Sequence, residues 1–98
     1  MINQVDVHQA AAALQKGTPL IDVREPDEFA AHHIAGSINI PLSQLQKMAD
    51  EIPDNCLMIC AVGARSGMAA SWLLKQGKHA TNVLGGIHAW HAAGLPLQ

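Results

Sequence analysis

One stretch of the chain, residues 56–68, constrains the fold more than any other. Its apolar run Leu57-Met58-Ile59 has no alternating polar positions, which is typical of a strand buried on both faces of a sheet. A loop begins at Cys60, and helix formers follow Ser66, whose side chain is a good N-cap. The stretch therefore predicts a strand, a short loop and a helix, with Cys60 at the carboxyl end of a central strand.

A cysteine in this position is expected to be reactive. The loop that follows it consists of Ala61, Val62, Gly63, Ala64 and Arg65. Its amides can point toward one place just before a helix N-terminus, and glycine permits the positive φ angle of a tight turn. Amide dipoles, a helix N-terminus and an arginine all favour the thiolate, which is the nucleophilic form. The alternative is an inert, buried cysteine beside an ordinary loop.

Strands and short helices alternate along the rest of the chain. Further strands are expected at 20–23, 37–40 and 81–84, and helices at 7–16, 26–32, 42–48 and 87–93. This order predicts an α/β sandwich with a mostly parallel sheet. Ligands bind outside the carboxyl ends of the strands in such sheets. Three strand exits are therefore expected to form one rim, at residues 22–25, 60–65 and 85–86.

Composition narrows the class of protein. The 98 residues are 49% hydrophobic and 14% charged, which suits one globular domain over residues 1–98. No apolar run approaches the roughly 20 residues that span a bilayer. Residues 1–6 lack the features of a signal peptide, so we expect a cytoplasmic protein without membrane attachment.

The two cysteines are not expected to form a disulfide. Cys56 and Cys60 would lie roughly 13 Å apart along one strand, whereas disulfide geometry needs Cα atoms within about 7 Å. We interpret Cys56 as a buried apolar side chain, with a resolving thiol as the alternative.

Charge is distributed unevenly along the chain. Residues 1–54 contain eight acids and three bases, a net charge of −5, whereas residues 55–98 contain three bases and no acid, a net charge of +3. A small anionic substrate would be attracted to the second part, which contains Cys60, and residues 61–65 are expected to bind it. Three scattered bases do not form a nucleic-acid-binding surface, so no such partner is expected. Six histidines form no recognisable ligand cluster in the sequence, so no metal is expected.

Side chains beside the predicted rim are expected to support the loop. Asp22 lies between apolar neighbours at a strand end and needs a partner if it is buried. Arg24 is two residues away, so we expect an ion pair that braces the loop rather than a direct role in chemistry. Ser66 is expected to support the start of the helix.

Four stretches together resemble the rhodanese family of sulfurtransferases. They are LIDVREPDEF (20–29), HIAGSINIP (33–41), CAVGARS (60–66) and VLGGIHAW (83–90). The resemblance covers nearly the whole chain and implies a three-layer α/β sandwich, with a five-stranded, mostly parallel sheet flanked by helices. It also implies that Cys60 takes a sulfane sulfur from thiosulfate or another persulfide or polysulfide donor. The resulting persulfide would pass the sulfur to cyanide or a thiol, including a protein thiol, without a metal or organic cofactor.

Two other functions remain open at this point. Cysteine-dependent phosphatases and arsenate reductases have a longer loop between cysteine and arginine than the four residues found here. Residues 55–98 also contain no carboxylate that could protonate a leaving group. The second alternative is a non-catalytic rhodanese-type binding module, although many such modules lack the cysteine. Ala61 and Val62 stand where thiosulfate-preferring relatives often carry a basic residue, which favours a persulfide or polysulfide donor.

Overall fold

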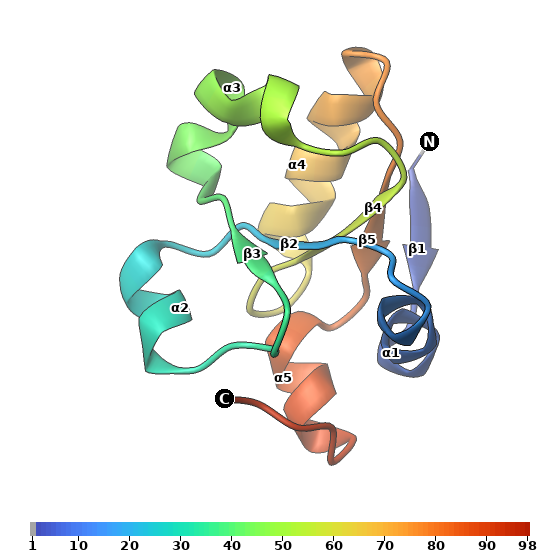
Figure 1. The fold of residues 1–98 in the computed structure, drawn as a ribbon, viewed down its shortest axis with the longest axis vertical. Helices are drawn as coiled ribbons and strands as arrows, with labels where there is room; N and C mark the ends of the chain where they lie inside the picture. Colours follow the sequence, from blue (N-terminus) through green and yellow to red (C-terminus); the bar gives the residue numbers. More distant parts are fainter. Residues whose placement is uncertain (1) are drawn as a thin grey trace.

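A five-stranded parallel sheet runs through the middle of the molecule (Figure 1). The computed structural model describes residues 2–98. The strands are β1 (Asn3–Val5), β2 (Leu20–Asp22), β3 (Ile38–Asn39), β4 (Cys56–Ile59) and β5 (Ala80–Val83). Their spatial order is β1-β5-β4-β2-β3, and every pairing is parallel. The predicted α/β fold with a parallel sheet is confirmed.

Helices cover both faces of this sheet. They are α1 (Val7–Gln15), α2 (Pro26–Ala31), α3 (Leu45–Met48), α4 (Ala64–Lys75) and α5 (Gly86–Ala92), with 3-10 turns at Leu42–Gln44 and Ala49–Glu51. Side chains of α3 and α4 pack into one core and side chains of α1 and α5 into another. The sheet thus separates two hydrophobic cores, one on each face.

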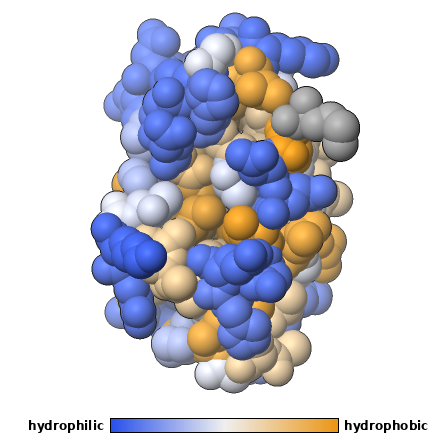
Figure 2. Space-filling model, turned by 90° about the vertical axis from the view of Figure 1, so that its right-hand side faces the viewer, coloured by the Kyte–Doolittle hydropathy of each residue, from blue (hydrophilic) through white to orange (hydrophobic). Residues whose placement is uncertain are grey.

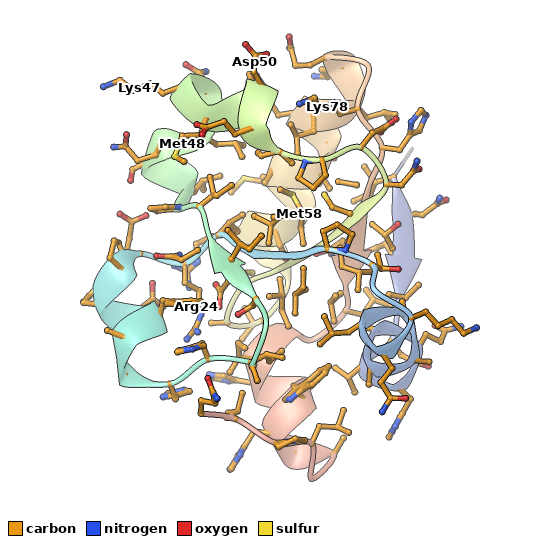
Figure 3. The ribbon with its side chains drawn as sticks, viewed as in Figure 1. Arg24, Lys47, Met48, Asp50, Met58 and Lys78 are labelled. Carbon is orange, nitrogen blue, oxygen red and sulfur yellow. The ribbon has the colours of Figure 1, made fainter. Side chains whose placement is uncertain are left out.

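Strand β4 supplies side chains to both cores in alternation. Cys56 and Met58 pack on the α4 side, whereas Leu57 and Ile59 pack on the side of α1 and α5. All four residues are buried, and Met58 lies at the middle of the sheet (Figure 3). Because both faces of the strand are covered, its sequence shows no polar alternation.

Local sequence signals place most of the other elements. The Asp6 carboxylate accepts a hydrogen bond from the Gln9 amide at 2.8 Å, and the Gln9 side chain accepts one from the Asp6 amide at 2.9 Å. This reciprocal capping starts α1 at the predicted residue. The strands after it are shorter than predicted by up to two residues or shifted by one. The expected helix 42–48 begins as the 3-10 turn Leu42–Gln44 and continues as α3.

Two features of the fold differ from the sequence-based expectation. Residues 3–5 form edge strand β1 through pairing with β5, although three mainly polar residues carry no strand pattern of their own. The helix after the cysteine loop begins at Ala64, with Gly63 as N-cap at φ 102°, so the prediction that Ser66 is the N-cap is wrong. Because Gly63 adopts a left-handed backbone conformation, the helix begins directly after it, and Ser66 lies within the first helical turn.

The surface is mixed in character. The face shown in Figure 2 interleaves hydrophilic and hydrophobic residues. Four large apolar side chains are well exposed within the described part of the chain, namely Ile38, Val62, Met68 and Leu84. Over residues 2–98, the helices are too short or too polar to cross a bilayer.

Candidate active site

Cys60 lies directly after β4, at the carboxyl edge of the sheet. The alternation along the strand places its side chain on the same face as Cys56 and Met58, where the first turn of α4 arrives. The turn is tight because Gly63 adopts a positive φ angle, and a Cβ atom there would lie 3.3 Å from the Gly85 amide nitrogen. The Cys60 side chain is fully buried beneath the loop.

Three hydrogen-bond donors converge on the Cys60 sulfur. The amides of Gly63 and Ser66 lie 3.1 Å and 3.3 Å from Sγ, and the Ser66 hydroxyl lies 3.2 Å from it. Within residues 2–98, hydrogen bonds to Sγ at normal geometry come from these two residues, while Ala61 and Ala64 form the path of the turn. The sequence pattern predicts Ser66 at the helix start, but it contains no signal for the two contacts of this residue with sulfur.

The three hydrogen-bond donors change the pKa of the Cys60 thiol. Burial raises the pKa of Cys60, but hydrogen bonds from the Ser66 hydroxyl and from the amides of Ser66 and Gly63 outweigh it, so the pKa lies below the ordinary value. Cys56 provides the contrast on the same strand. It is buried without such donors, and burial raises its pKa to about 11. Both thiols are free, and Cys60 is the more acidic of the two.

Arg65 is bound to a carboxylate that sequence analysis did not assign to the site. Its Nη1 and Nη2 donate to Oε1 and Oε2 of Glu28 at 2.7 Å and 2.9 Å, so the pair is bidentate. The hydrogen bond from Arg65 holds the pKa of Glu28 at about 2. The two side chains are 34% and 35% exposed, so solvent still reaches them. They are 37 residues apart in the chain, and no sequence spacing signals their contact.

The other two cations of residues 55–98 lie far from the cysteine loop. Helix α4 begins at the loop and ends at Lys75, about 16 Å away along the helix axis. The Lys78 ammonium donates to the carbonyl oxygens of Ala49 and Ile52, at the opposite end of the sheet (Figure 3). Of the three cations in residues 55–98, Arg65 is therefore the one that lies beside the cysteine loop.

The expected ion pair between Asp22 and Arg24 is present at the exit of β2, and both residues are buried. Nη2 of Arg24 donates to Asp22 Oδ2 at 2.8 Å and to the His32 carbonyl at 2.8 Å. Nη1 donates to the backbone carbonyl of Glu28 at 3.4 Å, and the arginine reaches from β2 toward α2 (Figure 3). The pair thus fixes α2 against the sheet and, with it, the partner of Arg65.

The three strand exits meet at one rim. The amides of Ile87 and His88, in the first turn of α5, donate to the carbonyls of Cys60 and Ala61 at 2.9 Å and 3.0 Å. A Cβ atom at Gly86 would lie 2.3 Å from the Cys60 carbonyl oxygen, so only glycine allows this approach. Beside the contact is a cavity of about 370 Å³ whose walls include Arg24, Glu28, Ala61 and His88.

Metal-binding groups are not gathered at this rim. Across the described residues, 2–98, no three or more His, Cys, Asp or Glu side chains are placed to hold a metal ion. The rim instead contains one thiol, its hydrogen-bond donors and an arginine that is paired with a carboxylate.

Comparisons with known proteins identify the family and the fold. The Rhodanese-like domain family matches residues 6–93. Thiosulfate sulfurtransferase GlpE of Vibrio cholerae is 32% identical over 98 residues, which cover 96% of this chain and 92% of that protein. The crystal structure of a rhodanese-related protein from Thermoplasma volcanium superposes with a TM-score of 0.91 at 33% identity, and covers 98% of this chain and 97% of that one.

Some relatives are considerably longer than the part that matches. YqhL of Bacillus subtilis is 46% identical over 74 residues, which are 72% of this chain and 59% of YqhL. A second Bacillus subtilis relative matches over 40% of its own length. The family match nevertheless spans most of the chain, and the alignment with GlpE runs over almost all of both proteins. This chain therefore belongs to the rhodanese-like domain family, a family of sulfurtransferases.

Proposed function

We propose that Cys60 carries sulfur as a persulfide between a sulfane donor and a thiophilic acceptor. The Cys60 thiolate attacks the outer sulfur of the donor, a new S–S bond forms, and the donor's own bond to that sulfur breaks. The leaving group keeps the electron pair and departs as sulfite from thiosulfate, or as a thiolate from a persulfide. An acceptor such as cyanide or a thiol then attacks the outer sulfur and releases the Cys60 thiolate.

One observation carries this proposal, the convergence of three donors on Sγ at 3.1 to 3.3 Å. Fixed donors stabilise a thiolate before attack and again when it leaves as the acceptor takes the sulfur. They come from the backbone of the loop and from Ser66, so the stabilisation needs no metal or organic group. The Cys60 side chain is fully buried in this structure, so a donor reaches the sulfur only after the atoms that cover it move.

The charge around the loop favours a donor of low charge. Arg65, at the end of the loop, is already paired with Glu28, and the exposed tip of the loop is the apolar Val62. A dianion such as thiosulfate finds little free positive charge at this rim. We therefore propose a persulfide or polysulfide as the preferred donor, with a small thiol or a protein thiol as the acceptor.

The test is a panel of donors and acceptors assayed with the wild type, Cys60→Ser and the matched control Cys56→Ser. Wild type and Cys56→Ser are expected to gain one sulfur atom at Cys60 by mass spectrometry and to transfer it to cyanide or a thiol. Cys60→Ser is expected to do neither while it keeps the fold. Sulfur transfer by Cys60→Ser at the wild-type rate contradicts the proposal. If no donor loads Cys60, the chain is a binding module.

The phosphatase alternative requires a proton donor at the leaving group. Glu28 does reach the loop, but the hydrogen bond from Arg65 holds its pKa at about 2, so it is ionised at neutral pH. An ionised carboxylate cannot protonate a leaving alkoxide. We therefore expect no Cys60-dependent hydrolysis of an aryl phosphate at neutral pH, and such hydrolysis would favour the alternative.

A further inference from the structure

A buried asparagine lies behind the reactive sulfur. Asn82, on β5, is 3% exposed, and its Oδ1 lies 2.6 Å from the hydroxyl oxygen of Ser66. The same hydroxyl oxygen lies 3.2 Å from Cys60 Sγ and 3.4 Å from the Gly63 carbonyl oxygen. Three acceptors therefore surround one hydroxyl group, which has a single proton to donate.

The orientation of the asparagine amide follows from its other neighbours. Its nitrogen lies 3.2 Å from the Gly63 carbonyl oxygen and 3.1 Å from Oε1 of Gln4. A backbone carbonyl can only accept, so the NH₂ group must face Gly63 and the oxygen must face Ser66. At 2.6 Å, two oxygens are in contact without repulsion only when a proton lies between them. The Ser66 proton therefore points to Asn82 Oδ1 when the sulfur is neutral.

The sulfur then faces a lone pair of the hydroxyl oxygen. A neutral S–H group can donate to that lone pair, but a thiolate cannot, because it has no proton. For the hydroxyl to stabilise the thiolate it must rotate, and Asn82 Oδ1 then loses the donor that it has in the described structure. Leaving a buried acceptor without a donor opposes ionisation of Cys60.

We propose that Asn82 is a positioning residue for the reactive sulfur, which competes with Cys60 for the Ser66 proton and so sets how readily the sulfur ionises. The inference rests on the proposed function of Cys60 as a thiolate nucleophile. Asn82 accepts the hydrogen bond from the Ser66 hydroxyl while the sulfur is a thiol or the neutral inner atom of a persulfide. When the free thiolate appears, the hydroxyl rotates and donates to the sulfur instead.

Charged groups near the loop are paired with one another rather than with the sulfur. Arg65 of α4 binds Glu28 of α2, and Arg24 binds Asp22 at the exit of β2. His88 of α5 contacts the loop through its backbone amide. In the structure of residues 2–98, these five side chains make no hydrogen bond to Sγ. The Ser66 hydroxyl is thus the one side-chain donor through which Asn82 can act.

The experiment titrates the Cys60 thiol by the ultraviolet absorbance of its thiolate, in a Cys56→Ala background that leaves one cysteine. Asn82→Leu removes the competing acceptor and keeps water out of its place. We expect the midpoint to fall by about one pH unit, because the freed hydroxyl donates to the charged sulfur. The Gly63 carbonyl remains satisfied by the Gly67 amide at 3.1 Å. Asn82→Ala carries the same expectation and serves if the leucine variant does not fold.

A double-mutant cycle separates this role from a general loosening of the loop. Ser66→Ala alone is expected to raise the midpoint, and adding Asn82→Leu to it is expected to change nothing further. Gln4→Ala is the matched control, because it removes the other partner of the Asn82 amide and leaves Oδ1 untouched; no shift is expected. The proposal is overturned if Asn82→Leu leaves the midpoint unchanged, raises it, or lowers it equally without Ser66.

The titration needs no sulfur donor, so its result is independent of the transfer assay. A lowered midpoint in a protein that accepts no sulfur would leave Asn82 as a positioning residue for the thiol and remove the proposed function. An unchanged midpoint in a protein that does transfer sulfur would keep the proposed function and remove the proposed role of Asn82.

Discussion

At the scale of single residues, two cysteines on one strand differ because their neighbours differ. Cys56 lies at the start of β4 among apolar side chains, and Cys60 lies just past its end, where the first turn of α4 provides donors. Burial alone raises a thiol pKa, as it does for Cys56, and at Cys60 the hydrogen-bond donors of the loop reverse that effect. The difference in pKa between the two thiols therefore comes from the loop that surrounds Cys60.

The pairing of Arg65 with Glu28 predicts which donor the loop prefers. Glu28→Gln removes the carboxylate and leaves the guanidinium free to bind an anion. We expect KM for thiosulfate to fall by about fivefold, which corresponds to about 1 kcal/mol, because the pair is partly exposed and screened by solvent. KM for an uncharged alkyl persulfide is expected to stay constant.

Steady-state kinetics with both donors check this prediction. Asp27→Asn is the control, because it removes a neighbouring acid of α2 that lies in the same helical turn and has no contact with Arg65. Equal changes for the two donors, or an equal response of the control, would show that Glu28 does not select between them.

At the scale of elements, the loop is held between the N-termini of two helices. Helix α4 supplies the amide and hydroxyl of Ser66 from one side. Helix α5 approaches from the other, where the amides of Ile87 and His88 donate to the carbonyls at the start of the loop. Both helices begin after a glycine with positive φ, Gly63 and Gly85, so the chain can turn sharply at each strand exit.

The approach of α5 predicts a large effect for Gly86→Ala. The new Cβ would lie 2.3 Å from the Cys60 carbonyl oxygen and 2.6 Å from that of Ala61, so backbone must move. We expect a loss of about 2 to 4 kcal/mol in the free energy of unfolding, together with reduced sulfur transfer. Urea denaturation and the transfer assay measure the two effects.

Gly17→Ala separates steric contact from backbone strain in that experiment. Gly17 also has a positive φ, 96°, but a Cβ there has nothing within 4 Å. It should lose only about 1 kcal/mol, from strain alone, and keep full activity. If the two alanine variants lose stability equally, the close packing of α5 against the loop contributes little.

At the scale of the whole molecule, the parallel sheet brings three strand exits to one edge and places a core on either side. Two arginines at that edge serve different purposes. Arg24 is buried with Asp22 and joins α2 to the sheet, whereas Arg65 is one-third exposed and lies beside the loop. Burial therefore separates an arginine that supports the fold from one that solvent still reaches.

This difference predicts opposite results for two truncations. Arg24→Ala leaves the fully buried Asp22 carboxylate without its partner, so we expect a loss of about 3 to 5 kcal/mol in unfolding free energy. Arg65→Ala should cost less than about 1 kcal/mol, since partly exposed ion pairs contribute little, while lowering sulfur transfer. Chemical denaturation of both variants decides between them, and comparable losses would contradict the distinction.

Local sequence signals were sufficient for much of the fold. The apolar run of β4, the Asp6 cap of α1 and the alternation of strands with helices predicted the α/β class and the position of Cys60 at a strand exit. These signals are informative because they act within one helical turn or one strand, where residues that are close in the sequence are also close in space. Strand β1 escaped prediction because its three residues become a strand only through pairing with β5.

By itself, the sequence determined that a thiol would stand at the start of a tight loop before a helix, because a buried strand, a glycine turn and helix formers succeed one another there. Only the tertiary structure decided which groups surround that thiol. Asn82 reaches Ser66 across 16 residues, and Glu28 reaches Arg65 across 37. Such contacts depend on strand order and on how helices dock against the sheet, to within tenths of an ångström. Hydrogen bonds are sensitive to just those distances, and no local pattern along the chain encodes them.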